Sequence, residues 1–258
     1  MIGAIAGDMI GSVYEAHPIK TKDFLLFDPQ CRFTDDSVLT IAVARAIMED
    51  SDYRRWVWEI GRRYPHAGYG GSFMAWLQAS DPQPYNSWGN GSAMRVSPVG
   101  WAFDNADTVM TEAAHSAEIS HNHPEGIKGA QAAALAVFLA RTTRDKGVIK
   151  QEIAGRFGYD LNRTMDRIRP SYGFDVSCQG TVPEAVIAFL EAHDYEDAVR
   201  NAVSLGGDSD TLACITGAIA EAYYGPLSSD IVNTVKTLLP DDLWWIVEQF
   251  CRRYVRRD

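Results

Sequence analysis

The sequence has few cysteines, no long uncharged apolar run and a shortage of basic residues. Its 258 residues include four cysteines, at positions 31, 178, 214 and 251. They are widely separated and form no C-x-x-C motif, which excludes a disulfide framework or a zinc knuckle. No stretch of about 18 uncharged apolar residues is present, so no membrane partner is expected.

The excess of acidic over basic residues argues against nucleic acid as a general binding partner. Lys and Arg total 24 against 34 Asp and Glu, which gives a formal net charge of −10. General nucleic-acid binding depends on cations that neutralise phosphates, so we do not expect it here. The apolar start, residues 1–10, has no cationic n-region and contains Asp8, unlike a signal peptide. A reduced, cytoplasmic protein is the resulting expectation.

Strand patterns are also missing. No apolar–polar alternation persists over a strand length, and no βαβ rhythm or fixed repeat is found. The composition, with 46% hydrophobic residues, supports a sizeable core. The sequence therefore predicts an all-α protein, a compact bundle of orthogonal helices that forms one domain over residues 1–258.

The stretch from Gly206 to Gly225 predicts the central helix of this bundle. Asp208, Asp210 and Thr211 follow a Gly-Gly pair and precede a run with almost no charge. A helix that is apolar on nearly every face is a buried helix. Positions i and i+2 point about 200° apart in a helix, so the two acids converge only in the loop or at the cap. Ordinary N-capping is the alternative for this motif.

Thr34, Asp35 and Asp36 repeat this arrangement before a second apolar helix. Each cluster alone is explained by capping, but two of them weaken that explanation. Together they offer four carboxylates and two hydroxyls, the hard oxygen ligands that suit Mg²⁺ or Mn²⁺. We therefore expect the two clusters to form the two halves of one two-metal site.

The N-terminal stretch, residues 2–13, predicts a buried helix with glycines every four residues, at Gly3, Gly7 and Gly11. Asp8 then faces inward, either as a group beside the metal site or as a hydrogen-bonded core acid. Glu15 follows on a helix end or loop because Pro18 disfavours helix at the residue before it. By composition alone, Glu15 is a solvated side chain.

The other helices are expected at residues 53–64, 72–78, 106–119, 126–139, 181–191, 195–204 and 231–257. Pro183 is expected in the first turn of its helix, and residues 144–177 form an excursion of helices and loops. Arg252, Arg253, Arg256 and Arg257 are interpreted as solvated cations near a helix C-terminus.

Several motifs in this order resemble the ADP-ribosylglycohydrolase family, and the resemblance covers most of the chain. They are GAIAGDMIGSVYE (3–15), FTDDS (33–37), GYGG (68–71), NGSAMR (90–95), SH (120–121), TVPEA (181–185) and SLGGDSDTLA (204–213). The resemblance implies an all-helical domain with a binuclear Mg²⁺ or Mn²⁺ centre. Its implied ligands are Thr34, Asp35, Asp36, Asp208, Asp210 and Thr211.

The resemblance also implies roles around this centre. Glu15 would lie on a mobile flap over the metals, and Glu15 or Asp35 would transfer the proton. The positions that match the ADP-ribose cleft are Gly70, Gly71, Gly91, Ser92 and His121, with Ser92 and the glycine amides on the diphosphate. Without the family, Asn90–Ser92 is equally a simple turn, and His121 an ordinary loop histidine.

The activity implied is metal-dependent hydrolysis of the bond between C1″ of ADP-ribose and an acceptor atom. The substrate is ADP-ribose attached to a protein or another acceptor, and a monomer is expected. Two alternatives stay open: a two-metal phosphohydrolase that cuts the diphosphate, and a non-catalytic ADP-ribose-binding protein.

Overall fold

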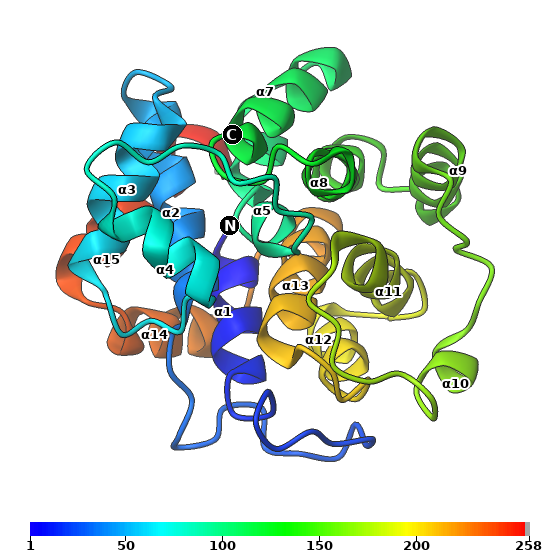
Figure 1. The fold of residues 1–258 in the computed structure, drawn as a ribbon. Helices are drawn as coiled ribbons and strands as arrows, with labels where there is room; N and C mark the ends of the chain where they lie inside the picture. Colours follow the sequence, from blue (N-terminus) through cyan, green and yellow to red (C-terminus); the bar gives the residue numbers. More distant parts are fainter. Residues whose placement is uncertain (256–258) are drawn as a thin grey trace.

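A computed structural model describes residues 1–255, and within them the chain is built from helices (Figure 1). The elements are α1 (Ile2–Gly11), α2 (Asp35–Met48), α3 (Tyr53–Arg63), α4 (Gly71–Gln78), α5 (Gly91–Met94), α6 (Ser97–Ala102), α7 (Ala106–Glu118), α8 (Pro124–Thr143), α9 (Lys146–Phe157), α10 (Met165–Ile168), α11 (Cys178–Leu190), α12 (Tyr195–Val203), α13 (Ser209–Tyr224), α14 (Ser229–Leu238), α15 (Asp241–Phe250) and the π-helical turn Cys251–Val255. Strand pairing in this part of the chain is limited to an isolated bridge between Gly89 and Ser177. The all-α prediction is confirmed.

Helix α13 lies at the centre, as the small number of charged residues in it predicts. It packs against α1, α8, α11 and α12, and its residues from Ser209 to Ala222 are all buried. It ends at Tyr224, and the next residue, Gly225, has a φ of 99°, in the left-handed region that favours glycine. The polar start of α13 is thereby held in the middle of the protein.

The glycines of α1 allow it to lie directly on α13. A Cβ atom on Gly7 would stand 2.0 Å from the Ala213 carbonyl oxygen, and one on Gly11 would stand 2.3 Å from that of Ser209. Gly3 meets Gly217 in the same way. The two backbones are therefore in van der Waals contact, which brings the C-terminal end of α1 beside the N-terminal end of α13.

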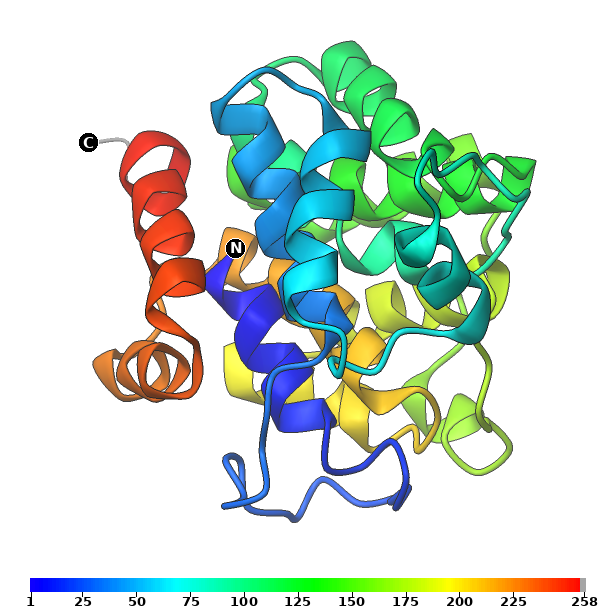
Figure 2. The ribbon, with the colours of Figure 1, turned by 60° about the vertical axis from the view of Figure 1, so that its left-hand side comes forward.

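The C-terminal region differs in detail from its prediction. It forms two helices, α14 and α15, with Pro240 at the boundary, and both lie on the outside of the bundle (Figure 2). Helix α14 packs on α1, and α15 packs on α2. Arg252 and Arg253 are exposed, as expected, whereas residues 256 and 257 lie outside the described part of the chain.

Helix α11 begins earlier than predicted. Ser177 caps it by accepting a hydrogen bond from the Gly180 amide, so the helix starts at Cys178. Pro183 consequently lies inside the helix, and its prediction for the first turn was wrong. In residues 1–255 no helix is both long enough and apolar enough to span a bilayer.

Candidate active site

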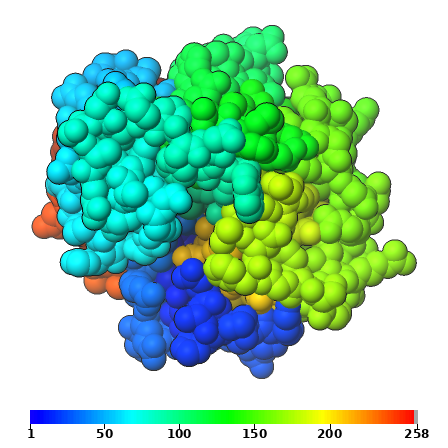
Figure 3. All heavy atoms as spheres, viewed as in Figure 1, coloured from blue at the N-terminus to red at the C-terminus, as the bar shows by residue number. Residues whose placement is uncertain are grey.

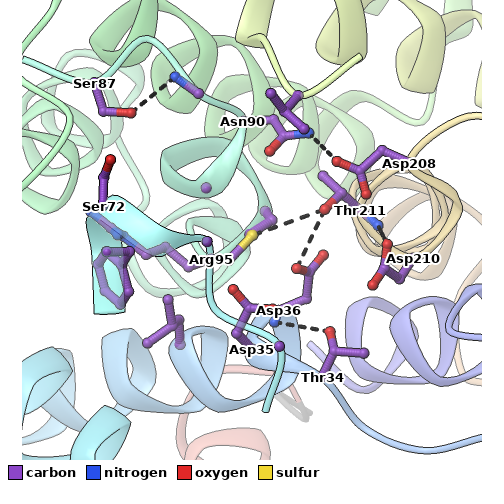
Figure 4. Close-up of a pocket in the computed structure, with 18 of the residues that line it drawn as sticks. Thr34, Asp35, Asp36, Ser72, Ser87, Asn90, Arg95, Asp208, Asp210 and Thr211 are labelled. Atoms are coloured by element: carbon purple, nitrogen blue, oxygen red, sulfur yellow. Dashed lines mark hydrogen bonds between the residues drawn. The ribbon is translucent and has the colours of Figure 1, made fainter. Parts of the chain in front are cut away.

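The two hydroxyl–acid clusters meet at one place in the structure. Thr34 is the N-cap of α2 and Asp208 is the N-cap of α13, and the two helix starts face each other (Figure 4). The Thr211 hydroxyl donates to the Asp36 carboxylate at 3.4 Å. The predicted convergence of the two clusters is therefore present in the fold.

Capping explains only part of this arrangement. Thr34 does cap α2, because its Oγ1 accepts a hydrogen bond from the Asp36 amide at 3.2 Å. Asp208 makes no capping bond to α13. Its carboxylate instead accepts a hydrogen bond from Asn90 Nδ2 at 2.8 Å, and the same amide group donates to Thr181 at 3.1 Å. Asn90 therefore orients Asp208, a role that the turn-like motif around it did not reveal.

Asp8 is a core acid with its hydrogen bonds satisfied, and it also supports the site. Its two oxygens accept from the Thr34 amide at 2.9 Å and the Thr34 hydroxyl at 2.6 Å, and also from the amide and hydroxyl of Ser37. Burial raises the Asp8 pKa to about 6, and these hydrogen bonds oppose the rise. The alternative of a hydrogen-bonded core acid is therefore confirmed, and the same bonds also fix the direction of Thr34.

Burial and mutual repulsion raise the pKa values of the clustered acids. Desolvation is the largest cause for Asp35, followed by the charge of Asp8, and its pKa rises to about 8. The pKa values of Asp36 and Asp210 are raised well above the ordinary value, first by burial and then by neighbouring carboxylates. Without a cation, the site therefore resists carrying its full negative charge.

The donor set fits a hard cation. Asp36 Oδ2 is buried without a hydrogen-bond partner. Within residues 1–255, none of the acids of the two clusters forms an ion pair with a basic side chain. An unpaired buried carboxylate is costly, and a divalent ion would remove that cost.

Glu15 lies beside the acids of the second cluster, Asp208 and Asp210. It is exposed, yet carboxylate oxygens of Glu15, Asp208 and Asp210 lie within 4.8 Å of one another, a spacing that could hold a metal ion. Partial burial, then the charge of Asp208, raise the Glu15 pKa. Asp35 and Asp36 belong to the other side of the site and are not part of this three-residue group.

The segment that carries Glu15 is anchored to α12 and to the loops that contain Tyr172 and Leu205. Lys20 donates to the Tyr172 carbonyl oxygen at 2.6 Å and also to that of Leu205. Lys22 pairs with Asp197, and Arg200 donates to the carbonyl oxygen of Phe24 at 2.7 Å. The flap implied by the family resemblance is thus tied down beyond Glu15 in this conformation.

A cavity of ≈ 630 Å³ opens over the acids, within the usual range for a small-molecule site. Figure 3 shows the surface hollowed where the N-terminal segment, the cyan segment and the yellow-green segment meet. Of the predicted site residues, the cavity is lined by Glu15, Thr34, Asp35, Asp36, Gly70, Gly71, Gly91, His121, Asp208, Asp210 and Thr211.

Ser92 is the exception among the predicted residues. It is fully buried, and its hydroxyl donates to the Gly126 carbonyl oxygen at 2.7 Å and lies 3.6 Å from the sulfur of Cys178. Its side chain is not among those that line the cavity. In this structure the Ser92 hydroxyl instead ties α5 to α8, and the expectation that Ser92 helps to hold the diphosphate stays a prediction.

An apolar rim that sequence analysis missed borders the mouth of the cavity. Trp88, Phe174 and Val176 line it and are exposed by 48%, 62% and 44%. Trp88 and Val176 lie beside the Gly89–Ser177 bridge, where the Asn90 amide donates to the Val176 carbonyl oxygen. The sequence shows apolar side chains at residues 174 and 176, but only the fold shows that they are exposed and line the cavity.

The fold and the cavity define an all-α protein in which two helix starts converge on an oxygen-rich acidic site. A model of the family described as ADP-ribosylglycohydrolase matches residues 1–257, and the chain belongs to this family. It is accordingly a hydrolase of a metal-dependent family, and its acidic cluster could hold metal.

Relatives and a solved structure agree with this membership. The chain is 25% identical to the ADP-ribosylhydrolase ARH3 of Homo sapiens, over 87% of this chain and 84% of that protein. It is 25% identical to the ADP-ribosylarginine hydrolase Tri1 of Pseudomonas putida, over 59% of this chain and 42% of that protein. A solved "ADP-ribosylglycohydrolase-related protein complex" has the same fold, with a TM-score of 0.72, 22% identity and coverage of 98% and 96%.

Proposed function

We propose that this enzyme hydrolyses the bond between C1″ of ADP-ribose and an acceptor atom and releases ADP-ribose. The observation that carries the proposal is the convergence of the two acidic clusters under one cavity, in a chain of the ADP-ribosylglycohydrolase family. Departure of the acceptor leaves positive charge on the ribose carbon, and an anionic site stabilises such a transition state. The named relatives act on ADP-ribosyl groups, which supports this substrate class.

We assign two Mg²⁺ or Mn²⁺ ions to Thr34, Asp35, Asp36, Asp208, Asp210 and Thr211. The ions, when bound, would supply Lewis acidity and neutralise charge on oxygen atoms. The bare Asp36 oxygen and the absence of basic partners for these acids in residues 1–255 support the assignment. Glu15 completes an oxygen group with Asp208 and Asp210, so it can reach the same ion or the water beside it.

The chain's own groups have distinct tasks in this proposal. Asp8 and Asn90 hold Thr34 and Asp208 in place, as their hydrogen bonds show. Glu15, at the open side of the cluster, takes or supplies the proton during hydrolysis, and Asp35 is the alternative. Gly70 and Gly71 have open space where a side chain would begin, which leaves room for the diphosphate against their backbone.

The acceptor end of the substrate would lie toward the apolar rim of Trp88, Phe174 and Val176 or toward Glu15. A monomeric, cytoplasmic enzyme is the accompanying proposal. Cys31, Cys178 and Cys214 are free and buried, which agrees with a reducing compartment.

The decisive experiment is product identification with a panel of substrates. Arginine-, serine-, nucleic-acid- and acetyl-linked ADP-ribose would each be incubated with enzyme, with Mg²⁺ and with EDTA. Release of intact ADP-ribose that requires Mg²⁺ supports the proposal, and the preferred substrate identifies the acceptor. Release of AMP and ribose phosphate would assign a phosphohydrolase, and binding of ADP-ribose without any turnover would assign a binding protein.

A further inference from the structure

Arg95 is the most unusual charged residue outside the acidic clusters. It is fully buried, and in residues 1–255 no carboxylate pairs with it. Its Nε and Nη1 atoms have no hydrogen-bond partner. Burial lowers its pKa to about 10, so it still carries its charge at neutral pH. A buried unpaired guanidinium is costly, so its position beside the cavity requires a reason.

The one bonded nitrogen of Arg95 leads to His121. Nη2 donates to the Ser116 carbonyl oxygen at 2.8 Å and to the Ser120 hydroxyl oxygen at 3.0 Å. The Ser120 oxygen lies 2.8 Å from Nδ1 of His121. Because Arg95 can only donate, the Ser120 oxygen accepts from it, and the Ser120 proton is free to point at Nδ1.

This chain of bonds favours one of the two positions for the proton of the His121 ring. If Ser120 donates to Nδ1, that atom is the acceptor and the proton lies on Nε2. Nε2 is the ring nitrogen nearer to Gly91, 3.0 Å from where a Cβ on that glycine would stand, and both residues line the cavity. Burial first, and the charge of Arg95 second, lower the His121 pKa well below its ordinary value, so the ring is neutral.

We propose that Arg95 and Ser120 are positioning residues that hold His121 as a neutral Nε2–H donor toward the ligand in the cavity. Through this donor His121 bonds an acceptor atom of the bound nucleotide, and a glycine at position 91 leaves the ring room to approach. The ligand half of this inference rests on the proposed function. The proton position on His121 belongs to the free protein and does not depend on it.

The test uses the full chain labelled with ¹⁵N-histidine. Long-range ¹H–¹⁵N spectra of the free protein report the tautomer, with His121→Asn to assign the signal. We expect the Nε2–H form between about pH 6 and pH 8. Ser120→Ala and Ser120→Cys should give a mixture of tautomers, since the hydroxyl donor is lost or weakened. ADP-ribose affinity, measured by calorimetry, should fall about 3- to 10-fold, the usual worth of one neutral hydrogen bond.

The matched control is Ser97→Ala, which removes another buried serine hydroxyl, one without a hydrogen-bond partner. It should change neither the spectrum nor the affinity. Arg95→Lys keeps the charge but loses the planar fork, so it should also disturb the tautomer. An Nδ1–H form in the wild type would overturn the proposal. So would weaker binding in Ser120→Ala with an unchanged tautomer, which would mean a packing role alone. If wild-type protein failed to bind ADP-ribose, the proposed function would fall, and the tautomer would still decide the inference.

Discussion

Thr211 and Asp36 are joined by a hydrogen bond of 3.4 Å although 175 positions separate them in the sequence. The bond links the first turns of α13 and α2, and the contact of α1 with α13 and α2 holds these turns in place. The acidic site is therefore a product of the core packing. Substitutions of the acidic residues should alter metal binding and turnover, whereas substitutions in the contact of α1 with α13 should alter the free energy of unfolding.

Asp36→Asn and Asp208→Asn should impair the same metal-binding event. Each removes one charge from one of the two clusters, so each should reduce the rise in melting temperature that Mg²⁺ or Mn²⁺ produces by stabilising the folded state. The double variant should lose little more than either single variant, because the residues share a site. Asp23→Asn, an exposed acid on the segment before α2, is the control and should keep the full rise. Two metal sites, each lost in only one variant, would contradict the convergence.

The stability of the metal-free protein should fall as the pH rises. Asp35 has a pKa of about 8 in the folded protein, against about 3.9 when unfolded. Between these two pH values only the folded state binds the Asp35 proton. The stability that this proton gives the folded state is complete below about pH 4 and is lost as the pH rises through about 8. The pKa values of Asp36 and Asp210 are also raised, so these two acids likewise make the folded state less stable as the pH rises.

Thermal unfolding in EDTA from about pH 5 to pH 8.5 measures this effect. The melting temperature should decline across the range, and Asp35→Asn should flatten the decline. Mg²⁺ should restore stability most at the high end, where the acids are ionised and repel one another. A melting temperature that rises steadily with pH in EDTA would rule out this balance of charges.

Gly7→Ala should destabilise the protein strongly, because the new methyl group would stand 2.0 Å from the Ala213 carbonyl oxygen. Backbone atoms cannot move aside cheaply, so we expect a loss of about 3 kcal/mol or more in the free energy of unfolding. Gly155→Ala in α9 is the matched control, since its Cβ would meet no atom within 4 Å. That change should be neutral or stabilise by about 0.5 kcal/mol. If urea unfolding showed equal changes in stability for Gly7→Ala and Gly155→Ala, the backbones of α1 and α13 would not be in direct contact at Gly7.

Much of this architecture follows from local sequence patterns. The uncharged run after Asp210 predicts the central helix, and the spacing of Gly3, Gly7 and Gly11 predicts a close helix contact. Ser92 shows where such reasoning stops: its side-chain direction depends on the Gly126 carbonyl oxygen, which belongs to another helix. Asn90 and Arg95 were missed for the same reason. Their partners, Asp208 and Ser120, come close only in the folded chain.

Glu15→Gln should separate binding from turnover. The change keeps the size and hydrogen-bonding reach of the side chain but removes its charge. Glu15 is exposed on the segment between α1 and α2, and the buried acids lie beneath it. We expect the affinities for metal and for ADP-ribose to change by less than about tenfold, roughly 1.4 kcal/mol. Single-turnover hydrolysis should slow by about 100-fold or more, the usual contribution of a positioned acid or base.

Calorimetry and single-turnover hydrolysis on one preparation make this comparison, with Asp23→Asn as an exposed acid whose loss should alter neither quantity. The alternative is that Glu15 binds the metal itself, because oxygens of Glu15, Asp208 and Asp210 lie within 4.8 Å of one another. If metal affinity fell as much as turnover, Glu15 would be a ligand of the resting site, and proton transfer would pass to Asp35. Turnover near the wild-type rate would leave Glu15 as a solvated side chain at the mouth of the cavity.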